Sequence, residues 1–395
     1  MSATVASSLM ALALLCAGGS ALAKAPDTNC SRRSDCAVLP IRGDAPATNP
    51  GSFRGFADPS IVHDPADPRR VWLAYSWPHV VAGKAPDDRA VQMAAVQTRL
   101  ARSDDGGVSF TYVGKLWPDE KVADPEGSGE NGINSSETAS LVSMKHDGHV
   151  TWYGAHLRYF LRPQTGYHPK YATSWRVQIG AASTPGGLAS AAETVLGVST
   201  TASVYNPAVQ LDRLAGLPIQ HCAMLNNPAL FARHETLYLV VECLAFVRTT
   251  LDFKHSSIQV FATRPEGPPA QWTWRHVGRL AGHELAEELD ADTIQQPELA
   301  RGADGRMLAL FTPAHRDPAI KVGTVGDGCV ALAMDSMEPP ALARDDRGRV
   351  IVRAAVHGTH VASCTYDRAS ATGIVAVSTG PRNGNWTLRA SKLRP

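Results

Sequence analysis

A short phrase recurs five times along this chain and limits the folds open to it more than any other feature. Each copy has a small or polar residue, often followed by proline, then one or two aliphatic residues, a turn and a β-rich run. The copies begin at Asp58, Thr138, Asn227, Gln296 and Pro339. Self-similarity at this scale is typical of repeat architectures, in which each unit buries its apolar face against its neighbours.

The units continue past the phrase into further strands. We predict third and fourth strands at 96–102, 111–116, 175–181, 257–263, 273–280, 373–378 and 386–390. Turns are frequent, in keeping with 33 Gly and 27 Pro, and no helical period is sustained. Five units of four antiparallel strands predict an all-β, five-bladed β-propeller over residues 56–395. Six blades would result if residues 200–214 contain strands, and short helices are expected at 188–195 and 282–290.

The N-terminal residues are expected to lie outside this fold. Residues 10–15 form a short apolar run, and Ala21-Leu22-Ala23 offers the small-x-small pattern of a signal peptidase site. We therefore predict a signal peptide over 1–23, a lead-in segment over 24–55, and a secreted or periplasmic protein. A lipoprotein anchored at Cys16 is the weaker alternative, because Leu15 stands where a small residue is expected.

Six cysteines follow the predicted cleavage site. An even number in an exported chain indicates disulfides, although sequence alone leaves several pairings open. Proximity along the chain favours pairing Cys30 with Cys36, Cys222 with Cys243, and Cys329 with Cys364.

Charge and hydropathy argue against several classes of partner. The formal net charge is +1, so there is no electrostatic reason to expect nucleic acid or a membrane surface as a partner. No run is long and apolar enough for a transmembrane helix. A monomer is expected.

One motif supports the propeller independently. Residues 103–110, Ser-Asp-Asp-Gly-Gly-Val-Ser-Phe, fit the pattern Ser-x-Asp-x-Gly-x-x-aromatic. This pattern resembles the Asp box of sialidase-like propellers, a hairpin clip in which Asp caps turn amides and the aromatic ring packs between blades. The motif predicts fold and not chemistry.

In a propeller the first strand of every blade runs along the central channel, so the residues that start these strands meet at one mouth. That reasoning places Asp58, Glu137, Asn227 and Gln296 together. Residues near the second strands and the rim are expected to join them in binding substrate: Arg54, Trp77, His156, Arg158, His315, Arg316 and His357, with Glu242 beside them.

The segment Phe56-Ala57-Asp58-Pro59-Ser60-Ile61-Val62 resembles the start of the five-bladed propeller glycosidases, meaning the arabinanase/xylosidase and invertase/levanase groups. The resemblance implies a glycan substrate and makes Asp58 the base or nucleophile of the carboxyl pair that glycoside hydrolysis needs. Two residues remain open as the acid. Glu137-Thr138-Ala139 has the shape of the family's acid motif but lies in the second unit. Glu242-Cys243 resembles the invertase acid, and its apolar neighbours would raise the pKa of Glu242.

Other functions stay open. Arg54, Arg158 and Arg316 could bind an acidic sugar, as in a sialidase or a polysaccharide lyase. A non-catalytic glycan-binding propeller is a further alternative. No cofactor is expected to be required, but the resemblance implies that the channel could hold Ca²⁺, with His360 of the His-x-x-His pair 357–360 as a metal ligand.

Overall fold

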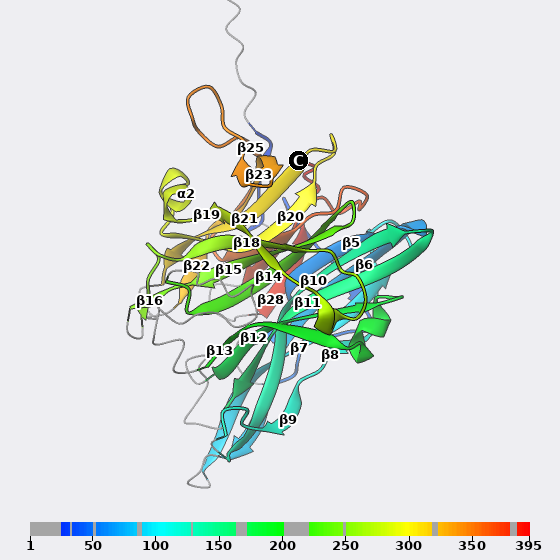
Figure 1. The fold of residues 1–395 in the computed structure, drawn as a ribbon, viewed down its shortest axis with the longest axis vertical. Coiled ribbons are helices and arrows are strands. Elements are labelled where there is room, and N and C mark those ends of the chain that lie inside the picture. Colours follow the sequence, from blue (N-terminus) through cyan, green and yellow to red (C-terminus); the bar gives the residue numbers. More distant parts are fainter. Residues whose placement is uncertain are drawn as a thin grey trace, which may run out of the picture.

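The structure is a computed structural model. It describes residues 25–31, 34–49, 53–84, 89–127, 129–162, 172–200, 221–247, 250–317, 323–379 and 385–395. The predicted signal peptide, Cys16 and residues 201–214 lie outside the described residues. Antiparallel sheets make up most of the described part of the chain, and the all-β propeller arrangement is confirmed (Figure 1).

Four sheets are blades built from contiguous chain, each with its first strand at the channel. Blade 1 contains β5 (Ala57–Asp64), β6 (Asp67–Lys84), β7 (Ala90–Ser103) and β8 (Phe110–Trp117). Blade 2 contains β10 (Asn131–His146), β11 (His149–Leu161), β12 (Ala172–Ala182) and β13 (Glu193–Ser199), with β9 (Glu120–Ala123) added beside β10. Blade 3 contains β14 (Met224–Arg233), β15 (Thr236–Leu244), β18 (Ser257–Thr263) and β19 (Arg275–Ala281).

Blade 4 contains β20 (Thr293–Arg301), β21 (Met307–Arg316), β23 (Gly328–Met337) and β25 (Val352–His357). Two short strands extend it, β22 (Thr324–Gly326) beside β21 and β24 (Pro340–Leu342) beside β23. A separate hairpin joins β16 (Phe246–Val247) to β17 (Thr250–Leu251). The predicted helix at 282–290 is present as α2 (His283–Glu288), whereas 188–195 divides between a 3₁₀ helix (Gly186–Ser190) and β13; a second 3₁₀ helix spans Pro269–Gln271.

The fifth sheet is assembled differently, and here the prediction of five contiguous blades is wrong. It joins β26 (Val361–Thr365), β27 (Val375–Thr379) and β28 (Asn385–Ala390) to two N-terminal strands, β2 (Ala37–Val38) and β4 (Arg54–Gly55). The predicted fifth copy of the phrase, at Pro339, is not a channel strand. It lies in the turn between β23 and β24 of blade 4. The backbone groups around it form hydrogen bonds within this hairpin and start no new blade.

The lead-in segment is ordered across three sheets. Its strand β1 (Asp27–Asn29) pairs with β25, β2 pairs with β28, and β3 (Ile41–Arg42) pairs with β8. These pairings fix the segment to blade 4, the fifth sheet and blade 1 in turn, so the N-terminal residues strap the two ends of the ring together.

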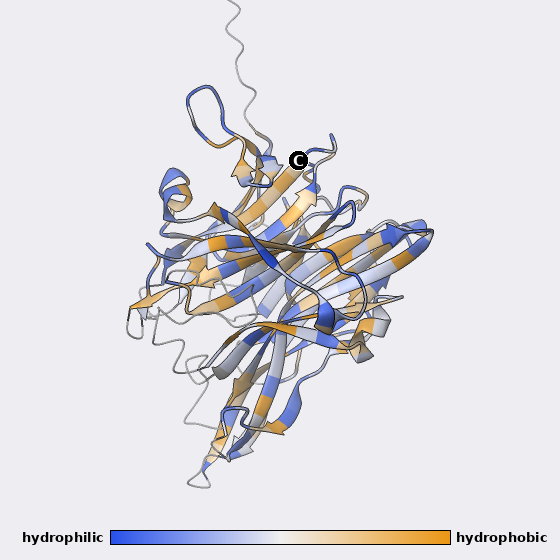
Figure 2. Cartoon of the chain, in the orientation of Figure 1, coloured by the Kyte–Doolittle hydropathy of each residue, from blue (hydrophilic) through white to orange (hydrophobic). Residues whose placement is uncertain are grey.

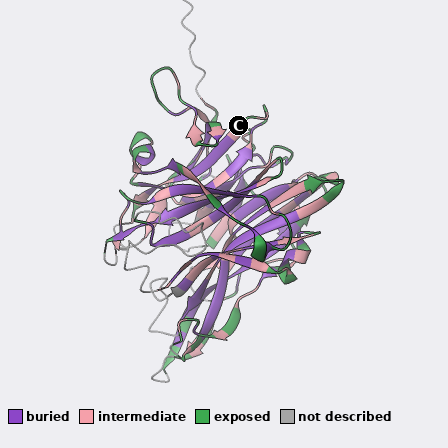
Figure 3. Ribbon diagram, in the orientation of Figure 1, coloured by how far each residue is buried: buried purple, intermediate pink, exposed green. Residues whose placement is uncertain are grey.

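The core lies between neighbouring sheets and not within any one of them. Five apolar clusters fill the successive interfaces, from the one between blades 1 and 2 to the one between the fifth sheet and blade 1. Strand residues that face these interfaces are apolar and buried, whereas turn residues are polar and exposed (Figures 2 and 3). Because each sheet is covered on both faces, burial of apolar surface stabilises the ring as a whole.

The five inner strands share a backbone irregularity at the channel mouth. In each strand, a bulge follows a residue with positive φ: Asp58 at 43°, Thr138 at 53°, Asn227 at 46°, Gln296 at 51° and Ser363 at 50°. Left-handed backbone is uncommon for residues other than glycine and clusters at functional sites. The bulge interrupts the strand pairing and aims these side chains at the channel.

The predicted covalent and turn features are confirmed. All three expected disulfides are present, and Cys329–Cys364 ties β23 of blade 4 to β26 of the fifth sheet. In the Asp box, the Asp105 carboxylate accepts hydrogen bonds from the Ser109 amide (3.0 Å) and hydroxyl (2.7 Å). Phe110 is fully buried between blade 1 and the fifth sheet.

Candidate active site

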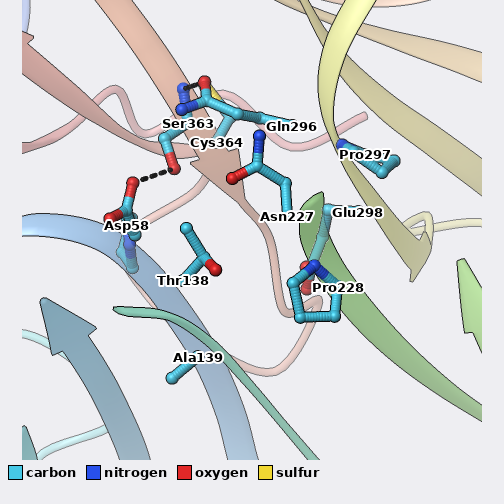
Figure 4. A pocket seen from close by; sticks show the side chains of 11 residues that line it. Asp58, Thr138, Ala139, Asn227, Pro228, Gln296, Pro297, Glu298, Ser363 and Cys364 are labelled. Atoms are coloured by element: carbon cyan, nitrogen blue, oxygen red, sulfur yellow. Dashed lines mark hydrogen bonds between the residues drawn. The ribbon is translucent and has the colours of Figure 1, made fainter. Parts of the chain in front are cut away.

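The starts of the inner strands surround a cavity of about 450 Å³, here called the upper cavity. Its polar walls come from Asp58, Glu137, Asn227, Gln296 and Ser363, on five different strands. Beneath them the channel narrows to a waist of about 30 Å³, shown in Figure 4, with room for about one water molecule. The upper cavity is therefore a blind pocket with a polar floor.

Asp58 is held at this floor by two serines. The Ser363 hydroxyl donates to Asp58 Oδ1 at 3.3 Å, and Ser76 on β6 makes a second hydrogen bond to the carboxylate (Figure 4). Burial raises the pKa of Asp58, and these two hydrogen bonds act in the opposite direction. Ser76 Oγ also accepts the Thr138 amide at 3.1 Å. Ser76 therefore couples Asp58 to the strand that carries the second carboxyl.

Glu137 is that second carboxyl, on β10 of blade 2. The Tyr159 hydroxyl donates to Glu137 Oε2 at 3.2 Å. Burial, followed by the negative charge of Asp58, raises the pKa of Glu137 to about 8. Burial therefore raises the pKa of both carboxyls, and the charge of Asp58 raises that of Glu137 further.

Glu242, the other expected acid, lies behind the cavity wall on β15. It is 1% exposed, and its Oε2 accepts Asn226 Nδ2 at 3.1 Å and Asn227 Nδ2 at 2.8 Å. Burial raises the pKa of Glu242 to about 7, in the direction predicted from its apolar neighbours, while the two asparagines lower it. Glu242 does not line the cavity and instead orients Asn227, which does.

Gln296 and Ser363 connect blade 4 to the fifth sheet at the same floor. Gln296 Oε1 accepts the Ser363 amide at 2.8 Å and the Thr312 hydroxyl at 3.0 Å. Both bonds use the side-chain carbonyl oxygen of Gln296. Asn227 and Gln296 thus offer amide groups of the kind that bind sugar hydroxyls.

Several side chains expected to bind substrate serve other contacts. Trp77 Nε1 donates to the Ala45 carbonyl at 2.8 Å and its ring covers the Arg99 guanidinium, so Trp77 holds the lead-in segment. His156 is fully buried, stacked on Trp117 and bonded to Glu193 at 3.0 Å.

The predicted basic residues also lie outside the described lining of the upper cavity. Arg158 pairs with Glu120 at 2.5 Å, and Arg54 bonds Asn385 at 2.5 Å. His315 pairs with Asp327 at 3.0 Å, and the Arg316 guanidinium lies over the Phe253 ring. His357 ends β25, where its carbonyl accepts the Cys30 amide. No Lys or Arg is found among the described residues that line this cavity.

His360 does line the upper cavity. Among the described residues, no three His, Cys, Asp or Glu side chains are grouped closely enough to hold an ion. Because Ca²⁺ also binds carbonyl oxygens and water, calcium in the channel stays a prediction of the resemblance.

Sequence reasoning missed several residues of the site. Ser363 was missed because β26 carries neither the proline nor the aliphatic pair of the other copies. Ser76 and Thr312 lie on second strands, where no local pattern distinguishes them from ordinary buried hydroxyls. Phe53 and Trp386 were missed as well. Their rings pack edge-to-face with centroids 5.0 Å apart and form an aromatic wall of the cavity, one from the N-terminal part of the chain and one from the C-terminal part.

No family model and no curated protein matches this chain. Among solved structures, a family 117 glycoside hydrolase from Zobellia galactanivorans aligns over 90% of this chain and 88% of its own, with 12% identity and a TM-score of 0.48. The α-L-arabinofuranosidase of Fusarium graminearum aligns over 90% and 96%, with 10% identity and a TM-score of 0.44. An arabinoxylan arabinofuranohydrolase of family 43 from Bacillus subtilis aligns over 85% and 62%, with 12% identity and a TM-score of 0.44.

These structural neighbours are glycoside hydrolases of several families, as the sequence resemblance predicted, and no single family is assigned. The identities and TM-scores are low.

Proposed function

We propose that this protein is a glycoside hydrolase that acts on a neutral glycan, with Asp58 and Glu137 as its carboxyl pair. One observation carries the proposal. Two half-buried carboxyl groups from adjacent inner strands line one blind cavity, and burial together with the charge of Asp58 raises the pKa of Glu137 to about 8. Two carboxyls held in different protonation states are what glycosidic bond cleavage requires.

The raised pKa of Glu137 suggests the roles. Glu137, in its protonated form, donates its proton to the glycosidic oxygen as the bond breaks. Asp58, which Ser76 and Ser363 hold by hydrogen bonds, serves in its charged form as base toward water or as nucleophile toward the sugar, and that charge stabilises the oxocarbenium-like transition state. Tyr159 holds Glu137 in place.

The lining supports a neutral sugar over an acidic one. A sialidase or lyase needs cations to bind the substrate carboxylate, and the described lining of the upper cavity contains no Lys or Arg. It offers the amides of Asn227 and Gln296 and the aromatic rings of Phe53 and Trp386, which suit hydroxyl groups and sugar faces.

Two further points belong to this proposal. We take the fifth sheet to act as a fifth, closing blade, because its inner strand β26 repeats the positive-φ bulge of the other four. We also take the protein to be exported, since three disulfides are typical of oxidising compartments. Among the described residues, no helix has the length and apolar character needed to cross a membrane.

The test is reducing-sugar release from a panel of plant, bacterial and host glycans. Wild type is compared with Asp58→Asn, Glu137→Gln and the matched control Glu235→Gln, an exposed turn residue. Each carboxyl variant should lose at least about 100-fold in kcat/KM while its circular dichroism and melting temperature stay near those of wild type. The control should keep full activity.

Activity that survives the loss of either carboxyl would exclude this mechanism. Binding of a glycan by wild type without any release would instead identify a non-catalytic glycan-binding propeller. Products that absorb in the ultraviolet would indicate a lyase.

A further inference from the structure

The opposite end of the channel holds a second cavity that the proposed activity does not use. This lower cavity has a volume of about 210 Å³ and is lined by the far ends of β5, β10, β14 and β20 and by the residues that follow β26. Glu298 lines both this cavity and the waist, so it separates the lower cavity from the proposed active site (Figure 4).

Basic side chains converge at the lower cavity without acidic partners. Arg301 and Arg368 both line it, and no ion pair joins either guanidinium to a carboxylate among the described residues. The pKa of Arg301 is lowered by burial and then by the positive charges of Arg368 and Arg233. The Arg301 guanidinium lies over the Phe231 ring at 5.7 Å, a contact that holds it in place without neutralising it.

A buried hydroxyl adds an unused donor. Tyr366 is 3% exposed and lines the lower cavity, and its hydroxyl has no hydrogen-bond partner among the described residues. A buried polar group without a partner destabilises the fold, so such groups usually meet a ligand or water.

The acidic groups nearby are already compensated. Asp367 bonds His63 Nδ1 at 2.8 Å and accepts the amides of His63 and Ala369. Asp304 pairs with Arg353 at 2.7 Å. Glu298 Oε1 accepts only a weak hydrogen bond from the Thr365 hydroxyl, at 3.4 Å, and burial raises the pKa of Glu298 to about 8, which favours its uncharged form at neutral pH.

The geometry points to a binding site for a doubly charged oxyanion, sulfate or phosphate, either free or as an ester on a larger molecule, held by Arg301 and Arg368 with the Tyr366 hydroxyl as a further donor. Guanidinium groups bind such oxyanions through paired, charge-assisted hydrogen bonds. Leu141, Leu230 and Phe231 form apolar walls beside the arginines, and a less polar surrounding strengthens that attraction. The bound anion would also relieve the mutual repulsion of the arginines.

The experiment is isothermal titration and thermal shift on the full chain with sodium sulfate and sodium phosphate, against sodium chloride at matched ionic strength. Wild type should bind sulfate or phosphate and gain melting temperature beyond the chloride reference. Arg301→Gln and Arg368→Gln should each weaken binding about tenfold or more, and Tyr366→Phe about threefold. The matched control Arg347→Gln, in an exposed turn of blade 4, should bind as wild type does.

Titration with glucose 6-phosphate and N-acetylglucosamine 6-sulfate distinguishes a free anion from an anion esterified to a larger molecule. Binding of these esters at least as tight as that of the inorganic ions assigns the site to an esterified ligand, and tighter binding of the inorganic ions assigns it to the free anion. Equal effects of sulfate and chloride on wild type, or equal sulfate binding by wild type and both arginine variants, would overturn the inference. In sulfate-free buffer the arginine variants should melt no lower than wild type, because each substitution removes a repulsive contact between two positive charges. A lower melting temperature there would reveal a folding defect, which is thereby distinguished from lost anion binding.

Discussion

The two mouths of the central channel are made by the same inner strands, yet they present different charged groups. At the strand starts, Asp58 and Glu137 face the upper cavity, whose described lining has no Lys or Arg. At the strand ends, Arg301 and Arg368 face the lower cavity without carboxylate partners. The repeat therefore determines the backbone at both ends, while the residues that differ between the copies determine which side chains each cavity presents. We expect that each end can be altered without the other.

The largest expected effect is on catalytic activity, which should depend on the upper mouth and not on the lower one. Asp58→Asn and Glu137→Gln should reduce kcat/KM by about 10²–10⁴-fold on whichever glycan the panel identifies. Arg301→Gln with Arg368→Gln, at the other mouth, should leave it unchanged. Initial rates of sugar release measure both. Loss of activity in the arginine double variant would show that the two ends are coupled.

The next effect concerns pH at the upper mouth. Because the pKa of Glu137 is raised to about 8, its acid form is lost as the pH rises through that value, and kcat/KM should then fall about tenfold per pH unit. Glu137→Gln should abolish this alkaline limb along with most of the rate. The measurement is a pH–rate profile of wild type from pH 5 to pH 10. A limb that is flat up to pH 10 would contradict the assignment of Glu137 as the acid.

A smaller effect is expected at the waist between the mouths. The folded-state pKa of Glu298, about 8, lies above its ordinary value of 4.5, so its stabilising contribution is complete below pH 4.5 and is lost as the pH rises through 8. Glu298→Gln should therefore be more stable than wild type at pH 9 by about 1–2 kcal/mol in free energy of unfolding. This value is smaller than the full pKa shift implies, because the carboxyl is partly exposed to the channel and solvent screens its charge. Urea unfolding at pH 5 and pH 9 measures the difference, with Glu235→Gln as the control.

The smallest effect lies outside both mouths. Asp105→Ala removes the hydrogen bonds of the Asp box and should cost about 1 kcal/mol in free energy of unfolding. Hydrogen bonds from Ser103 and Ser109 lower the pKa of Asp105 to about 2 despite some desolvation, so this stabilisation is present above pH 3.8 and lost toward pH 2. Sugar release and sulfate binding should both be unaffected. A change in either would place the hairpin in contact with a site.

Local signals in the sequence predicted much of the fold. Proximity along the chain was enough to pair Cys222 with Cys243, and the turn chemistry around Asp105 was enough to place a hairpin. Four of the five inner strands were located by their starts. The fifth was not, because Ala362-Ser363-Cys364-Thr365 lacks the proline and aliphatic residues, and its place is fixed by bonds to Gln296 and Asp58.

The site was harder to predict, since it depends on contacts between distant strands. The neighbours of Glu242 correctly indicated a raised pKa, but nothing local showed that Asn226 and Asn227 separate it from the cavity. Trp77 has the composition of a sugar platform, yet a buried pair of Arg99 and Asp44 draws it toward the lead-in segment. Which of several possible partners a side chain contacts depends on the tertiary structure, and the spacing of residues along the sequence does not reveal it.

The fifth sheet also imposes an order of events on the making of this protein. Strands β2 and β4 leave the ribosome among the first residues, and their partner β28 is among the last. The ring therefore cannot close before β28 has been synthesised, and the first blades must persist with an uncovered flank until then. The strap that completes the fold thus also postpones it.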